Sequence, residues 1–442
     1  MSEIELKSNV IKTGREKGII LRFILASLVG VFMFFVPVTI NGASSIMIDH
    51  IVSWIRASVP SVVPYYALFV MAIGAIYPFY TKKWNASIVD ICFSILKVVG
   101  VVFGILYCLK VGPAWFFAPD VGPFLYERLV ISVSLLVPIG SAFLALLVGY
   151  GLLEFIGTFC RPIMRPLWNT PGRSAIDAVA SFVGSYSLAL LITNRVYKEG
   201  KYTTKEAAII ATGFSTVSAT FMIIIAKTLD IMHLWNVYFW TTLVVTFIVT
   251  AITVRIPPLS RKPDTYVTEE GFPEPVYKEK MLERAWEDAL EVSKSAPSIM
   301  KNITVNLKDG FIMTMGILPS IMSVGLIGIV LAKFTQIFDW ISYIFYPFTW
   351  LLQLPEADLA AKAASVGIAE MFLPSLLVVS APLVTKFVIA VVSVSSILFF
   401  SASIPCILST DIPLKVSELI ILYVQRTILT LLIITPIAYL LL

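Results

Sequence analysis

Residues 174–197 read SAIDAVASFVGSYSLALLITNRVY, and this stretch decides which architecture the rest of the chain predicts. It is uncharged from Ala178 to Asn194, and basic residues crowd both of its flanks. A single crossing would place one basic cluster outside, although Lys and Arg favour the cytoplasmic side. A re-entrant helical hairpin that turns at Gly184-Ser185 keeps both clusters inside, because glycine permits the chain reversal. A short ordinary span is the alternative that this stretch leaves open.

The composition indicates a membrane protein. Of the 442 residues, 58% are hydrophobic and only 14% are charged, against about 25% charged in soluble domains. Only a bilayer solvates so much apolar surface, which excludes a soluble enzyme, a disordered protein and a nucleic-acid binder. Nine apolar segments are long enough to cross a bilayer: 19–40, 62–80, 87–109, 127–150, 206–229, 234–255, 311–333, 386–408 and 417–441.

A second weak apolar segment, 357–385, is interpreted as another re-entrant hairpin. The cytoplasmic segments are then 1–22, 81–86, 151–173, 195–205, 255–309 and 409–416. They hold 24 of the 33 Lys and Arg residues, a bias that supports this topology. We therefore expect a multi-pass protein of the bacterial cytoplasmic (inner) membrane, with its N-terminus in the cytoplasm.

The same order of segments occurs twice along the chain. A span, an aromatic segment, a hairpin and two further spans fill 127–256, and the same order fills 310–442. The first unit begins outside and the second inside, so they are predicted to be inverted repeats, as in secondary transporters. Residues 1–126 would be scaffold spans. Residues 257–309 would be a cytoplasmic linker with an amphipathic helix, which lies on the membrane surface or receives a regulatory partner.

The stretch LEFIGTFCRPIMRPLWNTPGRSAIDAVASFVGSYSLALLITNRVYKEGKYTTKEAAIIATGFSTVSATF, residues 153–221, resembles the Gate, or nucleoside-recognition, domain family. The whole chain resembles the YjiH-type bacterial membrane proteins of that family. The resemblance implies an all-α polytopic membrane protein with about nine transmembrane helices and two re-entrant hairpins in two inverted Gate-type repeats. Related Gate domains occur in concentrative nucleoside transporters, spore maturation proteins and ferrous iron transporters. Because nucleoside transporters of this architecture are trimers, a homo-oligomer is a further implication by analogy.

Candidate site residues gather in the two hairpins and in the spans after them. Hydroxyls and freed carbonyls suit Na⁺ or a polar solute, although Ser and Thr also bond to carbonyls of their own helix. By resemblance to nucleoside transporters, the ion-binding positions would be Ser187, Asn194, Thr212 and Ser215. The solute-binding positions are predicted to be Ser181, Ser185, Tyr186, Ser365, Glu370, Ser395, Ser396 and Arg426.

Two charged residues within the apolar segments need a partner or a function. An acid at a hairpin tip is expensive in a bilayer, so Glu370 is expected to accept a proton, bind a cation or hold the solute. In nucleoside transporters an acid in the second hairpin helps to bind the sugar. Arg426 lies in the middle of a span and either clamps an anionic group or pairs with Glu370.

The leading hypothesis is a secondary active transporter of a small polar metabolite (nucleoside-like, amino-acid-like or an organic acid), driven by Na⁺ or H⁺. The alternative is a non-transport signalling or assembly protein like the spore maturation relatives. An enzyme is not expected, since the chain lacks Walker A, H-E-x-x-H and G-x-S-x-G motifs. Neither a cofactor nor a metal site is expected, because the four cysteines form no C-x-x-C and the two histidines are far apart.

Overall fold

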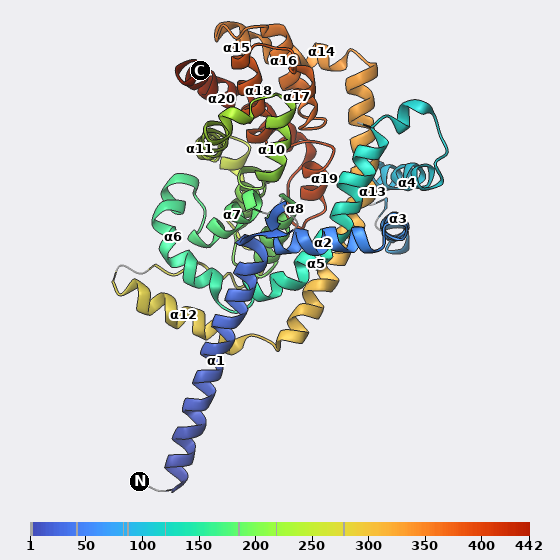
Figure 1. The fold of residues 1–442 in the computed structure, drawn as a ribbon. Coiled ribbons are helices and arrows are strands. Elements are labelled where there is room, and N and C mark those ends of the chain that lie inside the picture. The colour runs from blue at the N-terminus through green and yellow to red at the C-terminus, as the bar shows by residue number, and fades with distance from the viewer. Residues whose placement is uncertain are drawn as a thin grey trace.

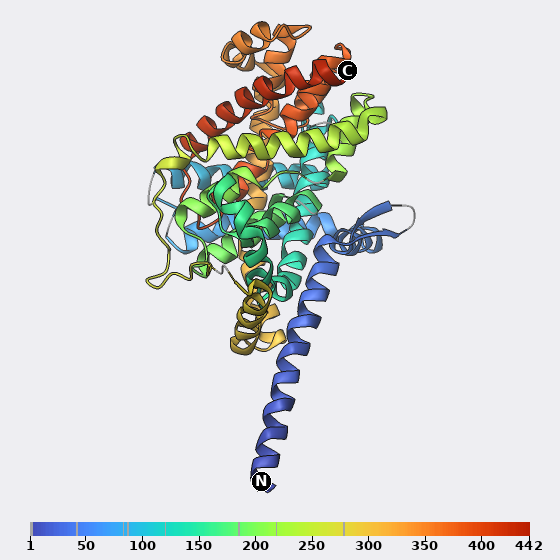
Figure 2. The ribbon, with the colours of Figure 1, turned by 90° about the vertical axis from the view of Figure 1, so that its left-hand side faces the viewer.

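The computed structural model describes the chain except for residues 1–2, 41–42, 83, 86–87, 120, 184–185, 218 and 277–278. The described part is helical apart from one β-hairpin (Figures 1 and 2). Within it, seven helical stretches are long and apolar enough to cross a membrane: Lys17–Phe34, Val63–Tyr80, Ile91–Leu109, Phe124–Val148, Met232–Thr253, Ile299–Leu331 and Val416–Leu441. Each overlaps a predicted span, which confirms the all-α polytopic class.

The N-terminal helix ends inside the apolar stretch that predicted it, 19–40. α1 (Glu3–Phe35), which projects from the helical body in Figure 2, stops just before Pro37, a residue that cannot donate a helical hydrogen bond. The β-branched residues that follow favour a strand, and β1 (Pro37–Ile40) pairs antiparallel with β2 (Ala43–Ile46). The next elements are α2 (Met47–Ser58), α3 (Val63–Tyr80), α4 (Ile88–Leu109), η1 (Ala114–Phe117), the π-helix η2 (Phe124–Val130) and α5 (Ile131–Val148).

The predicted hairpin, 174–197, forms an antiparallel pair of helices. The elements of this region are α6 (Leu152–Trp168), η3 (Gly172–Ser174), α7 (Ala175–Val183) and α8 (Tyr186–Lys198). Thr193 Oγ1 donates to Asp177 Oδ1 at 2.6 Å, and Tyr202 OH donates to Asp177 Oδ2 at 2.7 Å. The two ends of the hairpin therefore lie together, which a re-entrant segment requires and a single crossing forbids. The predicted tip, Gly184-Ser185, lies outside the described residues.

Two of the predicted spans are broken helices. The span 206–229 is divided into α9 (Thr204–Gly213) and α10 (Ala219–Thr228), and the span 386–408 into α18 (Leu383–Ser395) and α19 (Ser403–Leu408). Serines and threonines lie at both breaks, where their hydroxyls offer the backbone an alternative to helical hydrogen bonds. Such discontinuous helices are typical of transporters that bind a solute between two repeats.

The remaining helices belong to the end of the first predicted unit and to the second. η4 (Met232–Leu234) and α11 (Trp235–Thr253) end the first unit. The second contains α13 (Ile299–Phe334), α14 (Ile337–Ser342), α15 (Tyr346–Leu351), α16 (Ala357–Val366), α17 (Leu373–Leu377), α18, α19 and α20 (Val416–Leu441). Thr385 Oγ1 donates to Pro355 O at 2.6 Å, so the ends of the second hairpin also lie together. The inverted orientation of the two units stays a prediction.

The segment between the two units lies against the base of the first hairpin. After η5 (Leu259–Arg261), Thr265 O accepts from Thr204 N and Phe272 N donates to Gly200 O, both at 2.8 Å. The predicted amphipathic helix is present as α12 (Met281–Ser295), which packs on α1 and α6 and buries Ala285 and Ala289. The Trp286 ring lies 5.4 Å from that of Phe23.

Candidate functional site

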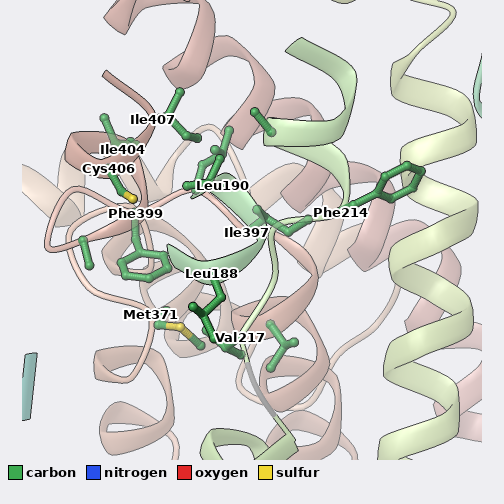
Figure 3. Packing of buried hydrophobic residues seen from close by; sticks show 14 of the residues in the cluster. Leu188, Leu190, Phe214, Val217, Met371, Ile397, Phe399, Ile404, Cys406 and Ile407 are labelled. Carbon is green, nitrogen blue, oxygen red and sulfur yellow. The ribbon is translucent and has the colours of Figure 1, made fainter. Parts of the chain in front are cut away.

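Four segments from the two units meet in one junction: α8, the break after α9, the tip of the second hairpin and the break after α18. Figure 3 shows one residue of each packed together: Leu188, Val217, Met371 and Phe399. All four side chains are buried. The junction therefore joins the weakest helical segments of both units in an environment that excludes bulk water.

Hydrogen bonds tie each break to the hairpin of its own unit. In the first unit, Ser181 Oγ of α7 donates to Thr216 O at 2.5 Å. In the second, Phe400 N donates to Ile368 O at 2.7 Å, and Ser401 N donates to Ala369 O at 2.9 Å. These bonds satisfy backbone groups that the breaks release, which irregular backbone at membrane depth requires.

A central cavity of about 300 Å³ opens beside this junction. Its wall is largely apolar, with contributions from α2, η2, α5, α8, α10, the second hairpin and both breaks. The lining residues are Asp49, Arg128, Leu129, Ser132, Val133, Leu136, Tyr186, Ser187, Val217, Phe221, Ile224, Glu370, Met371 and Phe399. The cavity thus brings together three predicted site residues, Tyr186, Ser187 and Glu370.

Glu370 lies at the tip of the second hairpin and reaches this cavity. Its side chain is only 2% exposed. Oε2 accepts from Phe372 N at 2.6 Å and from Leu373 N at 3.1 Å, so the carboxyl group caps the first turn of α17. Within the described part of the chain it forms no ion pair. The pairing with Arg426, one of the two alternatives for that arginine, is therefore absent among these residues.

Arg426 bridges the two helix breaks instead. Its Nε and Nη2 donate to Ser395 O, the last carbonyl of α18, at 3.0 and 2.9 Å. Nη1 donates to Thr250 Oγ1 at 3.1 Å, and that hydroxyl donates to Gly213 O, at the end of α9, at 2.9 Å. A helix C-terminus carries about half a negative charge. The ends of α9 and α18 together offset the guanidinium, which explains how it is 1% exposed without a carboxylate.

The other predicted site residues are dispersed, and their hydroxyls bond to backbone carbonyls or, for Ser395, to Thr430. Thr212 Oγ1 donates to Ala208 O at 2.7 Å and Ser215 Oγ to Ile210 O at 3.5 Å, both within α9 and its end. Ser365 Oγ donates to Phe338 O, Ser396 Oγ to Ser393 O, and Ser395 Oγ accepts from Thr430 Oγ1. Ser185 lies outside the described residues.

Two charged residues of the central cavity, Arg128 and Asp49, are not among the residues predicted from the sequence. Arg128 lies in η2 at the start of a predicted span, where a basic residue is usually interpreted as a charge that flanks the membrane helix. Asp49 lies in α2, a short helix that no long apolar run predicts. A signal for Asp49 was the strand-forming run after Pro37, which ends the first span early. No signal in the sequence pointed Arg128 toward a cavity.

A second, smaller cavity of about 180 Å³ lies toward the base of the first hairpin. Here Arg195 Nη1 pairs with Asp309 Oδ2 at 3.1 Å, and Lys198 Nζ pairs with Asp411 Oδ2 at 3.7 Å. Asp411 N also donates to Asn194 Oδ1 at 2.9 Å. We call these five residues the base latch. It joins α8 to α13 and to the loop after α19. The Asn194 side chain therefore bonds to Asp411 and not to the other three proposed ion ligands.

Beneath the hairpin, a buried ion pair anchors α6 to the loop after α8. Lys201 Nζ lies 2.7 Å from Glu154 Oε1. Burial alone would raise the pKa of Glu154, but Lys201 and Arg173 outweigh burial and hold that pKa below its usual value. Burial likewise opposes the charge on Lys201, yet Glu154 and Glu199 outweigh it and raise the pKa of the amine. Both members of the pair are therefore stabilised in their charged forms.

These features define a multi-pass membrane protein with a Gate domain: residues 130–232 match the family described as Gate, nucleoside recognition. The chain belongs to the same family as an uncharacterized protein of Alkalihalophilus pseudofirmus. The two are 33% identical over 460 residues, which cover 99% of this chain and 97% of that protein. The Gate match contains eight of the residues that line the central cavity, Leu136 and Tyr186 among them.

Two solved structures are also similar, both of variants of CNTnw in an outward-facing state. One aligns with a TM-score of 0.49 and 14% identity, over 95% of this chain and 99% of that one. The other aligns with a TM-score of 0.47 and 12% identity, over 94% and 99%.

Proposed function

We propose that this protein is a secondary active transporter that moves a small polar metabolite across the bacterial cytoplasmic membrane, driven by Na⁺ or H⁺. One observation carries the proposal: a cavity with a buried carboxyl group lies where two hairpins and two broken helices meet. Secondary transporters bind their solutes at such junctions, near the bilayer midplane. The Gate match, described as nucleoside recognition, supports solute binding by the first unit.

The base latch supports a transport cycle in which the cavity opens to one side at a time. From Ser187 to Asn194, α8 rises by about 10 Å, so the latch lies roughly that far from the central cavity. The residues of its ion pairs are partly exposed, between 25% and 57% of their side-chain surface. Ion pairs of this kind contribute at most about 1 kcal/mol each. They are therefore weak enough to break and re-form in every cycle.

The coupling ion is proposed to bind near the first break. Thr212 and Ser215 lie there, and the buried Thr216 Oγ1 has no hydrogen-bond partner among the described residues. Thr212→Val and Ser215→Ala each remove a hydroxyl ligand with little change in volume. If these hydroxyls ligate Na⁺, the sodium-dependent rise in melting temperature should fall in both variants. An unchanged sodium response in both would reject the assignment.

The test of transport is uptake into vesicles that contain the purified protein. Labelled nucleosides, amino acids and organic acids are offered with an imposed Na⁺ or pH gradient. Glu370→Gln should reduce uptake of the accepted solute at least tenfold. Glu287→Gln, at an exposed position of α12, is the matched control and should leave uptake unchanged. If the folded protein takes up none of these solutes under either gradient, the transport proposal is refuted. A non-transport role like that of spore maturation proteins is then favoured.

A further inference from the structure

The central cavity carries opposite charges on an apolar wall. Glu370 and Asp49 contribute carboxyl groups, and Arg128 contributes a guanidinium. Eight of the fourteen lining residues have apolar side chains: Leu129, Val133, Leu136, Val217, Phe221, Ile224, Met371 and Phe399. A volume of about 300 Å³ lies at the low end of small-molecule pockets, about 300–1,000 Å³. The occupant should therefore be small, with a largely apolar body and with groups of both charges.

Glu370 has one carboxyl oxygen available to a ligand. Oε2 takes both backbone N–H groups of the hairpin tip. Oε1 accepts no hydrogen bond in the described part of the chain, and it is not fully buried. Since the residue lines the cavity, Oε1 faces that space. A carboxylate that is 2% exposed is costly unless a cation compensates it.

Arg128 supplies the complementary charge. Within the described residues its guanidinium forms no ion pair and no hydrogen bond, although it lines the same cavity. It is exposed, so its charge is hydrated when the cavity is empty. A carboxylate on the solute would replace that water with a charge-assisted, two-pronged hydrogen bond.

We propose that the cavity binds a small zwitterion with an apolar side chain, such as an apolar α-amino acid, whose ammonium meets Glu370 and whose carboxylate meets Arg128. This rests on the proposed transport function. An uncharged nucleoside would leave both Glu370 and Arg128 without a counter-charge. A dicarboxylic acid would be repelled by Glu370. Only a solute with both charges compensates both Glu370 and Arg128 while it covers the apolar wall.

The test compares four probes. L-leucine, L-leucinamide and 4-methylpentanoate share one carbon skeleton, and uridine represents the nucleosides. Leucinamide lacks the carboxylate, and 4-methylpentanoate lacks the ammonium. Affinity is measured from the thermal shift of the purified protein, and transport from vesicle uptake. We expect L-leucine to bind at least about tenfold more tightly than the other three, since one charge-assisted hydrogen bond is worth that much or more.

The variants assign each charge. Arg128→Gln should abolish the preference for leucine over leucinamide, and Arg128→Lys should retain part of it. Glu370→Gln should abolish the preference for leucine over 4-methylpentanoate. Arg284→Gln, an arginine on the exposed face of α12, should change neither preference.

The outcomes separate this inference from the transport proposal. Uptake of uridine or 4-methylpentanoate with no response to leucine would overturn the zwitterion and leave transport intact. Tight binding of leucine without uptake of any probe would support the zwitterion and overturn transport. Preferences that survive both Arg128→Gln and Glu370→Gln would overturn the assignment of the two charges.

Discussion

Replacing Arg426 tests whether the buried guanidinium serves the two helix breaks or Glu370. Its three hydrogen bonds go to two acceptors, Ser395 O and Thr250 Oγ1, at 2.9 to 3.1 Å. Hydrogen bonds to charged groups contribute about 1.5–3 kcal/mol each, whereas side-chain bonds in membrane proteins average about 0.6 kcal/mol. Arg426→Gln should therefore lower the free energy of unfolding by about 2–4 kcal/mol. Arg426→Lys should lose less, because it keeps the charge beside the two helix C-termini.

Glu370→Gln provides the second arm of a double-mutant cycle. A glutamine oxygen can still accept from Phe372 N and Leu373 N, so the loss of stability should be about 1 kcal/mol or less. Arg426 and Glu370 share no hydrogen-bond partner. The two effects should then add within about 0.5 kcal/mol. Unfolding in detergent, followed by intrinsic fluorescence against denaturant, measures all four proteins.

A structural ion pair would give a different result. If Glu370 and Arg426 compensated each other, each single change would strand a buried charge, and the double variant would regain much of the loss. A coupling free energy above about 1.5 kcal/mol in that direction would refute our account of Arg426 as the bridge between the helix breaks.

Three further predictions concern the side of the membrane that we propose is cytoplasmic. Cysteines introduced at Lys198 and Arg165, whose side chains are 47% and 48% exposed, should both react only with reagents on the cytoplasmic side; labelling of one from outside would contradict the hairpin. The Glu154–Lys201 pair should stabilise the fold at neutral pH. Because the pKa of Glu154 is lowered and that of Lys201 raised, this contribution should vanish as the pH falls through the glutamate pKa or rises through the lysine pKa. In thermal melts, Glu154→Gln should remove the loss of stability that the protein shows as the pH falls. If the melting temperature still falls with pH as in the unaltered protein, this assignment is wrong. Asp411→Ala should open the base latch and speed hydrogen exchange in α8 several-fold, with α16 as the unchanged reference; equal rates in α8 would speak against a latch.

The class of protein and the position of its hairpins could be read from the sequence because both depend on local properties. Long uncharged runs predicted α3, α4, α11, α13 and α20, since a bilayer selects helices by length and hydropathy. Basic clusters on both sides of 174–197 predicted that its ends lie together, and the Thr193–Asp177 hydrogen bond places them so. The amphipathic spacing at 278–295 predicted α12 within a few residues.

The partners of the charged residues were decided by tertiary structure alone. Hydropathy marks Arg426 as anomalous in a span, but only packing shows that the ends of α9 and α18 converge on it. Asn194 carries an amide suited to an ion, yet Asp411, 217 residues away, engages it. Arg128 looks like a flanking charge until η2 turns it into the central cavity. Periodicity and composition describe one segment at a time, whereas a binding site is made where several distant segments meet.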